Sequence, residues 1–235
     1  MGRPIKSGGV PREDLCVVTK AWNTEHGYDQ ILRAFEASQQ RLNLEQVDLY
    51  LLHWPFPERI AESWRAMERL VDEKRVRAIG VSNFRITDLE TLLATANVPP
   101  ACNQIELHPY FTQPEIRGFC EQHGIQIVSY SPLGTGSWSN IPNASKPVAD
   151  SVIREIAEQH DVSPAQVILR WNQQHGWVPV PKSEDPGRMR QNIALEGLTL
   201  ADAEMARIDA LERGQRFNVD PQAAIEANLK MAVPA

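Results

Sequence analysis

Residues 47–55 read Val-Asp-Leu-Tyr-Leu-Leu-His-Trp-Pro, and this stretch decides the class of fold. Residues 47–52 form an almost continuous apolar run, which is typical of a strand covered on both faces in a parallel sheet. The expected strand spans residues 47–54, with His53 near its end, so it carries a polar side chain to its carboxyl end. Similar runs lie on both sides of it, and we therefore expect an α/β fold whose chemistry is placed at strand ends.

Five further runs have the same character and span residues 15–20, 78–83, 102–108, 125–132 and 177–181. Helical patterns separate them, for example over residues 28–43 and 60–75. Thr87, with Glu90 three residues later, predicts a helix N-cap, and Ser163-Pro164 predicts the start of another helix. Alternation of strands with helices of this length indicates parallel strands joined by crossovers.

Polar residues lie at or near the ends of most of these runs: Lys20, His53, Ser82, Asn83, Tyr130, Ser131, Lys182 and Ser183. In the run at 102–108, Asn103, Gln104 and Glu106 lie within the run, and His108 ends it. Taken singly, each has a structural explanation, such as a hydrogen-bonded core histidine or a turn. In a parallel barrel, however, all the strand ends share one rim, where active sites are built. A doubly wound sheet also gathers strand ends at a crevice, but the chain has no G-x-G-x-x-G fingerprint. The coincidence over consecutive strands therefore predicts a (β/α)8 barrel enzyme.

Composition narrows the class of protein. The 235 residues are 42% hydrophobic and 23% charged, and we expect one globular domain over residues 1–235. The net charge of −6 argues against nucleic-acid and anionic-membrane partners. Residues 1–10 lack the apolar core of a signal peptide, and no apolar run is long enough to cross a bilayer. The three cysteines lack metal-ligand spacing, which predicts reduced thiols in a cytoplasmic protein without a metal site.

Two segments do not fit the strand–helix repeat. Residues 133–148 are rich in Gly, Ser, Asn and Pro, and we interpret them as a long functional loop. Residues 214–235 are interpreted as a C-terminal loop or tail.

Several strings together identify a family. They are Val-Thr-Lys-Ala-Trp-Asn at 18–23, Asp-Leu-Tyr-Leu-Leu-His-Trp-Pro at 48–55, Ile-Gly-Val-Ser-Asn-Phe at 79–84, Asn-Gln-Ile-Glu-Leu-His-Pro-Tyr at 103–110, Tyr-Ser-Pro-Leu-Gly at 130–134 and Pro-Lys-Ser at 181–183. In this order they resemble the aldo-keto reductases, and within them the bacterial 2,5-diketo-D-gluconate reductase group. The resemblance covers essentially the whole chain.

The resemblance implies a TIM barrel that binds NADPH and reduces aldehydes or ketones by hydride transfer. Hydride addition builds negative charge on the carbonyl oxygen, which requires a positioned proton donor. The family uses a tyrosine, whose usual pKa of about 10 is lowered by a neighbouring ammonium group. Lys20 matches that lysine, and His53 matches the histidine that orients the carbonyl or relays a proton. Trp22 and Trp54, with His53, are expected to line the substrate pocket.

The resemblance also implies a cofactor site. Ser82, Asn83 and Gln104 match the residues that bind the nicotinamide amide, and Tyr130 matches the ring that stacks on the nicotinamide. The remaining matches are Ser131, Leu133 and Gly134 at the pyrophosphate, Lys182, Ser183 and Arg188 at the 2′-phosphate, and Gln191 and Asn192 at the adenine. Glu184 and Asp185 depart from the family pattern, and their charge opposes a phosphate. NADPH is therefore the predicted cofactor, with NADH as the alternative.

The chain also departs from the family at its start. About six of the eight βα units are expected here, with residues 2–6 ending the helix after the family's second strand. The segment with the catalytic Asp and Tyr is then expected upstream of Met1. Tyr50 does not replace that tyrosine, because three positions along a strand place it on the face opposite His53. We therefore expect the polypeptide as given to be inactive and to associate through open strand edges, whereas the full-length parent is a monomer.

Three hypotheses remain open. The first is an aldo-keto reductase whose coding region begins upstream. The second is a truncated, non-catalytic remnant that binds dinucleotide or a protein partner. The third is an unrelated doubly wound enzyme.

Overall fold

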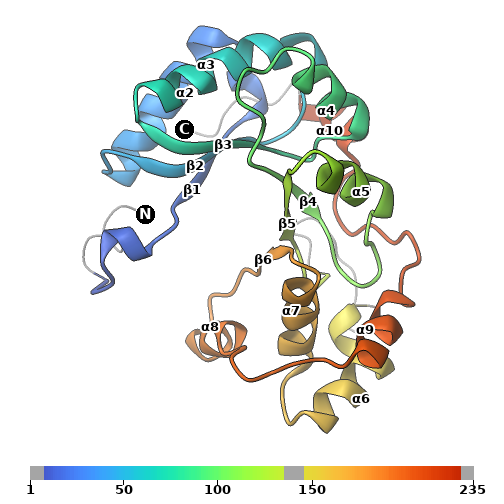
Figure 1. The fold of residues 1–235 in the computed structure, drawn as a ribbon. Coiled ribbons are helices and arrows are strands. Elements are labelled where there is room, and N and C mark those ends of the chain that lie inside the picture. Colours follow the sequence, from blue (N-terminus) through green and yellow to red (C-terminus); the bar gives the residue numbers. More distant parts are fainter. Residues whose placement is uncertain (1–7, 135–145, 229–235) are drawn as a thin grey trace. The chain divides into compact units, whose positions relative to one another are not determined.

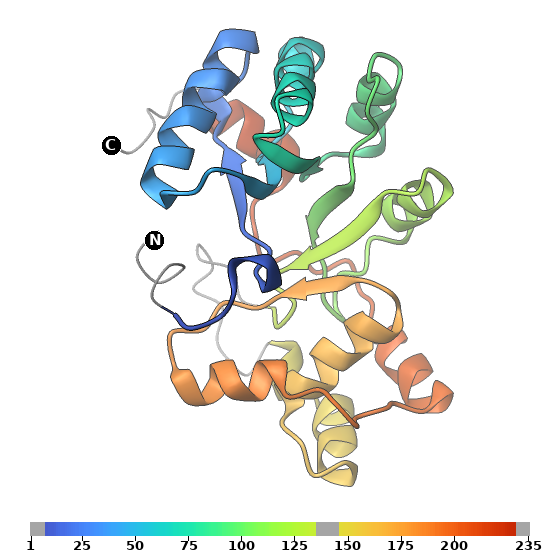
Figure 2. The ribbon, with the colours of Figure 1, turned by 60° about the vertical axis from the view of Figure 1, so that its left-hand side comes forward.

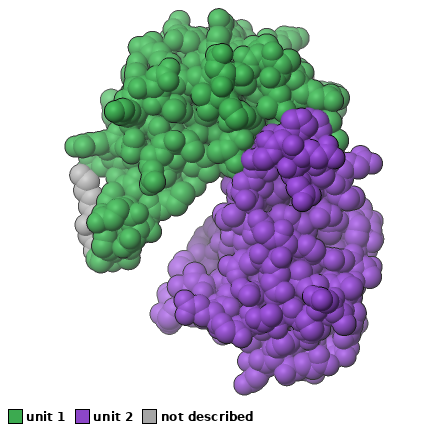
Figure 3. Space-filling model, in the orientation of Figure 1, with its two compact units in different colours: residues 1–103, 221–235 green, residues 104–220 purple. Residues whose placement is uncertain are grey.

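The computed structural model describes residues 8–134 and 146–228. Residues 2–6, predicted to end a helix, lie outside the described residues, as does most of the predicted loop at 133–148. The chain forms two compact units, which Figure 3 shows in different colours. Unit 1 comprises residues 1–103 and 221–235, and unit 2 comprises residues 104–220.

Unit 1 is built on three parallel strands in the order β1-β2-β3. The strands are β1 (Val18–Ala21), β2 (Val47–Leu52) and β3 (Val76–Ser82), and the helices are α2 (Tyr28–Leu42), α3 (Ile60–Asp72), α4 (Ile86–Leu93) and α10 (Pro221–Asn228). The described residues of this unit also form the short 3₁₀ helices η1 (Arg12–Asp14), η2 (Asn23–Glu25) and η3 (Pro57–Arg59). Helices α2 and α3 pack against each other and against the strands (Figure 1).

Close packing of the strands requires a glycine at Gly80. In the register of the sheet, Lys20 pairs with Leu51, and Leu51 pairs with Gly80. A Cβ atom at Gly80 would lie 2.8 Å from Leu51 Cδ2 and 2.9 Å from both the carbonyl oxygen and the Sγ of Cys102. Contacts this short do not occur at real Cβ atoms, so the strand can take only glycine here without a shift of its neighbours.

Unit 2 contains the parallel pair β5 (Gln126–Tyr130) and β6 (Val178–Val180), which lie side by side in Figure 2. Its helices are α5 (Pro114–Gln122), α6 (Ser151–Gln159), α7 (Pro164–Gln174), α8 (Pro186–Ile193) and α9 (Asp202–Asp209), with the 3₁₀ helix η5 (Pro147–Ala149). Strand β4 (Cys102–Glu106) contains the boundary between the units. The predicted cap of α7 is confirmed, because Ser163 Oγ accepts a hydrogen bond from the Gln166 amide at 3.3 Å.

All six predicted strands are present, and they follow one another in the sheet in sequence order. The predicted α/β class is therefore confirmed for the described residues. Among the helices that the structure describes, none combines the length and apolar character needed to cross a membrane.

Two predictions about helices were wrong. Helix α4 is capped by Arg85 rather than Thr87, because the Asp88 carboxylate accepts a hydrogen bond from the Arg85 amide at 3.0 Å and also binds its guanidinium. The predicted C-terminal loop or tail contains α10. Asp220 followed by Pro221 at the first helical position is a start signal that the sequence analysis did not use.

Candidate functional site

Unit 1 holds the predicted catalytic residues at adjacent strand ends. Lys20 lies on β1 opposite Leu51, and the His53 amide donates to the Ala21 carbonyl at 3.1 Å. Because His53 lies two positions beyond Leu51, its side chain shares the face of Leu51 and Lys20. The predicted pair is therefore brought to one face of the strands, and both side chains are half-buried.

Burial changes the acid–base behaviour of this pair. Burial lowers the pKa of Lys20 to about 8, and the neighbouring Cys102 thiol acts in the opposite direction. Burial, and then the positive charge of Lys20, lowers the pKa of His53 to about 3. Near neutral pH, His53 is therefore an uncharged imidazole beside a lysine whose proton is unusually easy to release.

The two predicted pocket tryptophans lie against His53. The ring of Trp22 meets the imidazole edge-on, with centroids 5.0 Å apart, and the ring of Trp54 lies nearly parallel to it at 6.2 Å. Trp22 begins the turn at η2, where its amide donates to the Glu25 carboxylate at 2.9 Å. The structure thus groups Trp22, His53 and Trp54 into one aromatic cluster.

Ser82 and Asn83 follow at the end of β3, and both are buried. Asn83 has a left-handed backbone, with φ of 62°, and its side-chain amide donates to the His53 carbonyl and to Ser82 Oγ, both at 3.1 Å. The next turn is held by Asn103, whose side chain donates to the Phe84 carbonyl at 2.9 Å. Asn103 is a positioning residue that the sequence analysis noted on its strand but left without a role.

The tyrosines of unit 1 do not lie beside Lys20. Tyr50 points to the helical side of the sheet, where its ring meets Phe35 edge-on with centroids 5.0 Å apart. Its hydroxyl is buried without a hydrogen-bond partner in the described structure, and burial raises its pKa. Tyr28 begins α2 and interacts with Arg69. Neither tyrosine of this unit is placed as the proton donor.

Unit 2 carries the other predicted cofactor residues, beginning with the buried Gln104 on β4 and Tyr130 at the end of β5. Burial, and then the negative charge of Glu106, raises the pKa of Tyr130, so its ring remains a neutral surface. Ser131 follows with a left-handed φ of 50°. Gly134, with φ of 69°, completes the turn, and a Cβ there would lie 2.4 Å from Pro147 and 2.8 Å from Phe217.

A buried carboxylate holds the segment that covers this turn. Glu106 accepts hydrogen bonds from the backbone amides of Phe217 at 2.7 Å and Asn218 at 3.2 Å. Burial alone would raise the pKa of Glu106, but the hydrogen bonds from His108 and the Phe217 amide, and the charges of His108 and Arg216, hold it below its usual value. Asn218 in turn donates to Ser131 Oγ at 3.4 Å. Residues 217–218 are therefore bound to Glu106 and Ser131, and no sequence motif marks them.

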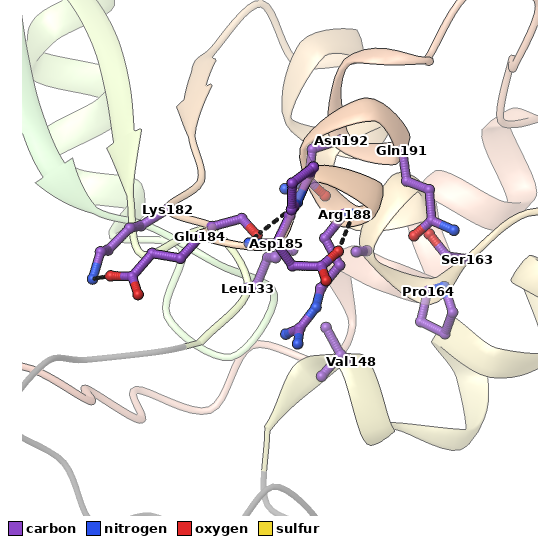
Figure 4. A pocket seen from close by; sticks show the side chains of 13 residues that line it. Leu133, Val148, Ser163, Pro164, Lys182, Glu184, Asp185, Arg188, Gln191 and Asn192 are labelled. Carbon is purple, nitrogen blue, oxygen red and sulfur yellow. Dashed lines mark hydrogen bonds and ion pairs between the residues drawn. The ribbon is translucent and has the colours of Figure 1, made fainter.

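A cavity of about 810 Å³ lies in unit 2, at the start of α8. It gathers Leu133, Lys182, Ser183, Arg188, Gln191 and Asn192, six of the predicted cofactor residues (Figure 4). The sequence analysis missed five other lining residues, Val148, Ser163, Pro164, Ala165 and Pro186. Ser163 was read only as a helix cap, because its contribution to the cavity comes from tertiary structure.

The charges of the cavity are paired in a specific way. Lys182 Nζ lies 2.9 Å from Glu184 Oε1, and this pair stands apart from the Arg188 guanidinium in Figure 4. The hydrogen bond and the charge of Lys182 lower the pKa of Glu184. Asp185 caps α8 by accepting a hydrogen bond from the Arg188 amide at 2.7 Å. An anion that enters the cavity therefore meets two cations and two carboxylates.

Metal-ligating side chains do not gather into a metal site within the described residues. Over residues 8–134 and 146–228, no three His, Cys, Asp or Glu side chains are grouped so that they could hold a metal ion.

Comparisons with known proteins identify the family of this chain. The model of the aldo/keto reductase family matches residues 1–213. The 9,11-endoperoxide prostaglandin H2 reductase of Trypanosoma cruzi is 45% identical over 221 residues, which are 94% of this chain and 76% of that protein. The 2,5-diketo-D-gluconic acid reductase B of a Corynebacterium species is 39% identical over 223 residues, 94% of this chain and 78% of the relative.

A solved structure of another protein is also similar to this chain. A mutant of Gox0644, crystallised in complex with NADPH, is 38% identical and superposes with a TM-score of 0.85, covering 95% of this chain and 79% of the other. The family model, the relatives and the structural likeness together show that this chain belongs to the aldo/keto reductase family.

Proposed function

We propose that this chain binds NADPH and takes part in the reduction of small aldehydes or ketones to alcohols. The observation that carries the proposal is the cavity in unit 2, which gathers six independently predicted cofactor residues. Its volume of about 810 Å³ is that of a pocket for a cofactor-sized ligand. The mutant of Gox0644, a relative with the same fold, was solved with NADPH.

Within this proposal, the residues of unit 2 hold the adenosine end of the cofactor. Lys182, Ser183 and Arg188 bind the 2′-phosphate, while Gln191 and Asn192 contact the adenine. Leu133, with Ser131 and Gly134, belongs to the turn at the pyrophosphate. Support comes from the cavity lining, because Leu133, Ser183 and Arg188 all border the same space.

The nicotinamide contacts are proposed for each unit by itself: Ser82 and Asn83 in unit 1, and Gln104 and Tyr130 in unit 2. The buried amides of Asn83 and Gln104 offer donors and acceptors for a carboxamide, and the neutral Tyr130 ring offers a stacking surface. The bound cofactor supplies the hydride for the reaction.

Lys20 and His53 are proposed to act on the carbonyl oxygen of the substrate. With its pKa lowered to about 3, His53 is neutral at physiological pH and can donate a hydrogen bond to that oxygen without carrying a charge. The ammonium of Lys20 favours the negative charge that develops there. Trp22 and Trp54, which flank His53, form the apolar walls of a site for a small carbonyl substrate.

The test of this proposal is a titration with both dinucleotides. Arg188→Ala should weaken NADPH binding more than NADH binding, because a guanidinium grips the 2′-phosphate that only NADPH carries. Arg190→Ala is the matched control, since Arg190 lies on the same helix but does not line the cavity. Equal losses for the two cofactors, or an equal effect of the control, would contradict the assignment.

A second candidate function is dinucleotide binding without turnover. It is favoured by one observation, that neither Tyr28 nor Tyr50 of unit 1 lies beside Lys20. Carbonyl-dependent oxidation of NADPH, followed by its absorbance, separates the two candidates. Turnover at about 1–10³ per second would support the reductase, whereas tight NADPH binding without oxidation would support the binding protein.

A further inference from the structure

The rim of the cavity in unit 2 has as many carboxylates as cations among its lining residues. Lys182 and Arg188 carry the positive charges, and Glu184 and Asp185 carry the negative ones. A site that selects a phosphate normally concentrates cations and backbone donors against it. The balance at this cavity is therefore unfavourable for selecting a phosphorylated over an unphosphorylated ligand.

The positions of the two carboxylates show how each acts. Asp185 occupies the N-terminus of α8, where its Oδ1 accepts the Arg188 amide at 2.7 Å. The N-terminus of α8, which would favour an anion, is thus already occupied by the carboxylate of Asp185. Glu184 has no such structural role, since its side chain is 84% exposed and its recorded partner is Lys182, at 2.9 Å.

Arg188 and Lys182 differ in whether a carboxylate is paired with their charge. Among the described residues, no carboxylate forms an ion pair with the Arg188 guanidinium, which leaves it available to a ligand. Lys182, by contrast, is 82% exposed and already engaged by Glu184. A bound phosphate must either displace Glu184 from Lys182 or approach the lysine against the charge of Glu184.

We infer that Glu184 is a specificity-determining residue, which competes with the 2′-phosphate of NADPH for Lys182 and thereby narrows the preference for NADPH over NADH. The inference rests on the proposed function, because it takes the cavity as the adenosine site. It predicts that this chain uses Arg188 as its main phosphate ligand and binds NADPH less tightly, relative to NADH, than a chain without a carboxylate at position 184.

The experiment is a fluorescence titration of the full chain with NADPH and with NADH. Exposed ion pairs have small energies, so Glu184→Gln should tighten NADPH binding about two- to fivefold and leave NADH binding unchanged. The matched control is Glu155→Gln, which removes the same charge from an exposed pair with Arg207 that does not line the cavity. The control should change neither affinity.

A double-mutant cycle tests whether the effect runs through Lys182. In a Lys182→Met background, Glu184→Gln should no longer improve NADPH binding, because the cation that it competes for is gone. A gain that persists in full would overturn the competition, since it would show simple repulsion. An equal gain for NADPH and NADH would overturn the role in specificity.

Failure of the proposed function has a different signature. If the unaltered chain binds neither dinucleotide, the cavity is not a cofactor site and the inference falls with it. If both dinucleotides bind and Arg188→Ala is selective while Glu184→Gln has no effect, the proposed function stands and this inference alone is wrong.

Discussion

The side-chain amide of Asn83 donates a hydrogen bond to the backbone carbonyl of His53, with Nδ2 and O 3.1 Å apart. The bond joins the ends of β2 and β3, just beyond the last paired residues of the two strands. It depends on a left-handed backbone at Asn83, with φ of 62°, which asparagine tolerates better than most residues. The proposed catalytic histidine is therefore held from the neighbouring strand.

Asn83→Ala should lower the free energy of unfolding by about 2–3 kcal/mol. Loss of the buried hydrogen bonds contributes about 1 kcal/mol, and the left-handed backbone adds about 1–2 kcal/mol for alanine. Asn83→Gly is the control, because glycine removes the bonds but keeps the backbone unstrained. Urea unfolding should therefore rank the variants as wild type, then Gly, then Ala, and an alanine variant as stable as the glycine variant would contradict the strain argument.

Gly80→Ala should destabilise unit 1 by about 1–3 kcal/mol, the usual cost of overpacking a core. The added methyl meets the Cys102 carbonyl oxygen, which as a backbone atom cannot move aside as a side chain does. Gly118→Ala provides the contrast within α5, because nothing lies within 4 Å of its Cβ position. That change should instead stabilise by about 0.5–1 kcal/mol. Thermal unfolding of the two variants should shift in opposite directions.

His26 should make stability fall as the pH drops from about 6.5 towards 4. Burial is the main cause that lowers the pKa of this histidine from 6.5 to about 4, with its side chain only 3% exposed and Nδ1 3.3 Å from Ser63 Oγ. Over this window the unfolded chain binds a proton that the folded chain does not, so acid favours unfolding by about 1.4 kcal/mol per pH unit. His26→Gln should flatten the dependence of the urea midpoint on pH, and an unchanged slope would contradict the shift.

Lys20 should affect stability at the opposite end of the pH range. Its pKa in the folded chain is lowered to about 8 from 10.5 in the unfolded chain, mainly by burial. Between these values the unfolded chain holds a proton that the folded chain has lost, so stability should rise with pH. The stability advantage of Lys20→Met over the wild type should therefore be largest below pH 8 and should disappear towards pH 10.5. Urea midpoints at pH 7 and pH 10 measure the difference, and an advantage that does not shrink would contradict the prediction.

The sequence predicted the elements well where hydrophobic periodicity decides them. All six strands and the helices α2, α3 and α7 lie close to their predicted positions. The cap of α4 was misplaced by two residues, because a Thr-x-x-Glu spacing also occurs inside the helix and only the contact of Asp88 with Arg85 shows where it begins. Helix α10 was missed because its apolar side chains do not form a clear stripe along one face of the helix.

The candidate site was predictable only where residues follow motifs. The placement of polar residues at strand ends marked Lys20, His53 and Lys182, and the family resemblance added Arg188; each lies at a strand end or along the cavity. No motif assigned a role to Asn103, Phe217 and Asn218, because they act through hydrogen bonds to Phe84, Glu106 and Ser131, which lie far from them in the sequence. The effect of Glu184 was foreseen as repulsion, whereas its ion pair with Lys182 required coordinates.

Unit 1 is assembled from both ends of the chain. Helix α10 (Pro221–Asn228) belongs to it, contacts η2, and binds α4 through a hydrogen bond of 2.8 Å from Arg85 to Gln222. During synthesis, residues 104–220 leave the ribosome before this helix does. Unit 2 is continuous and can finish folding while the chain is still being made, but unit 1 has to wait for its last helix. Translation that stops before residue 221 would thus leave the proposed catalytic unit, and not the proposed cofactor cavity, without one of its parts.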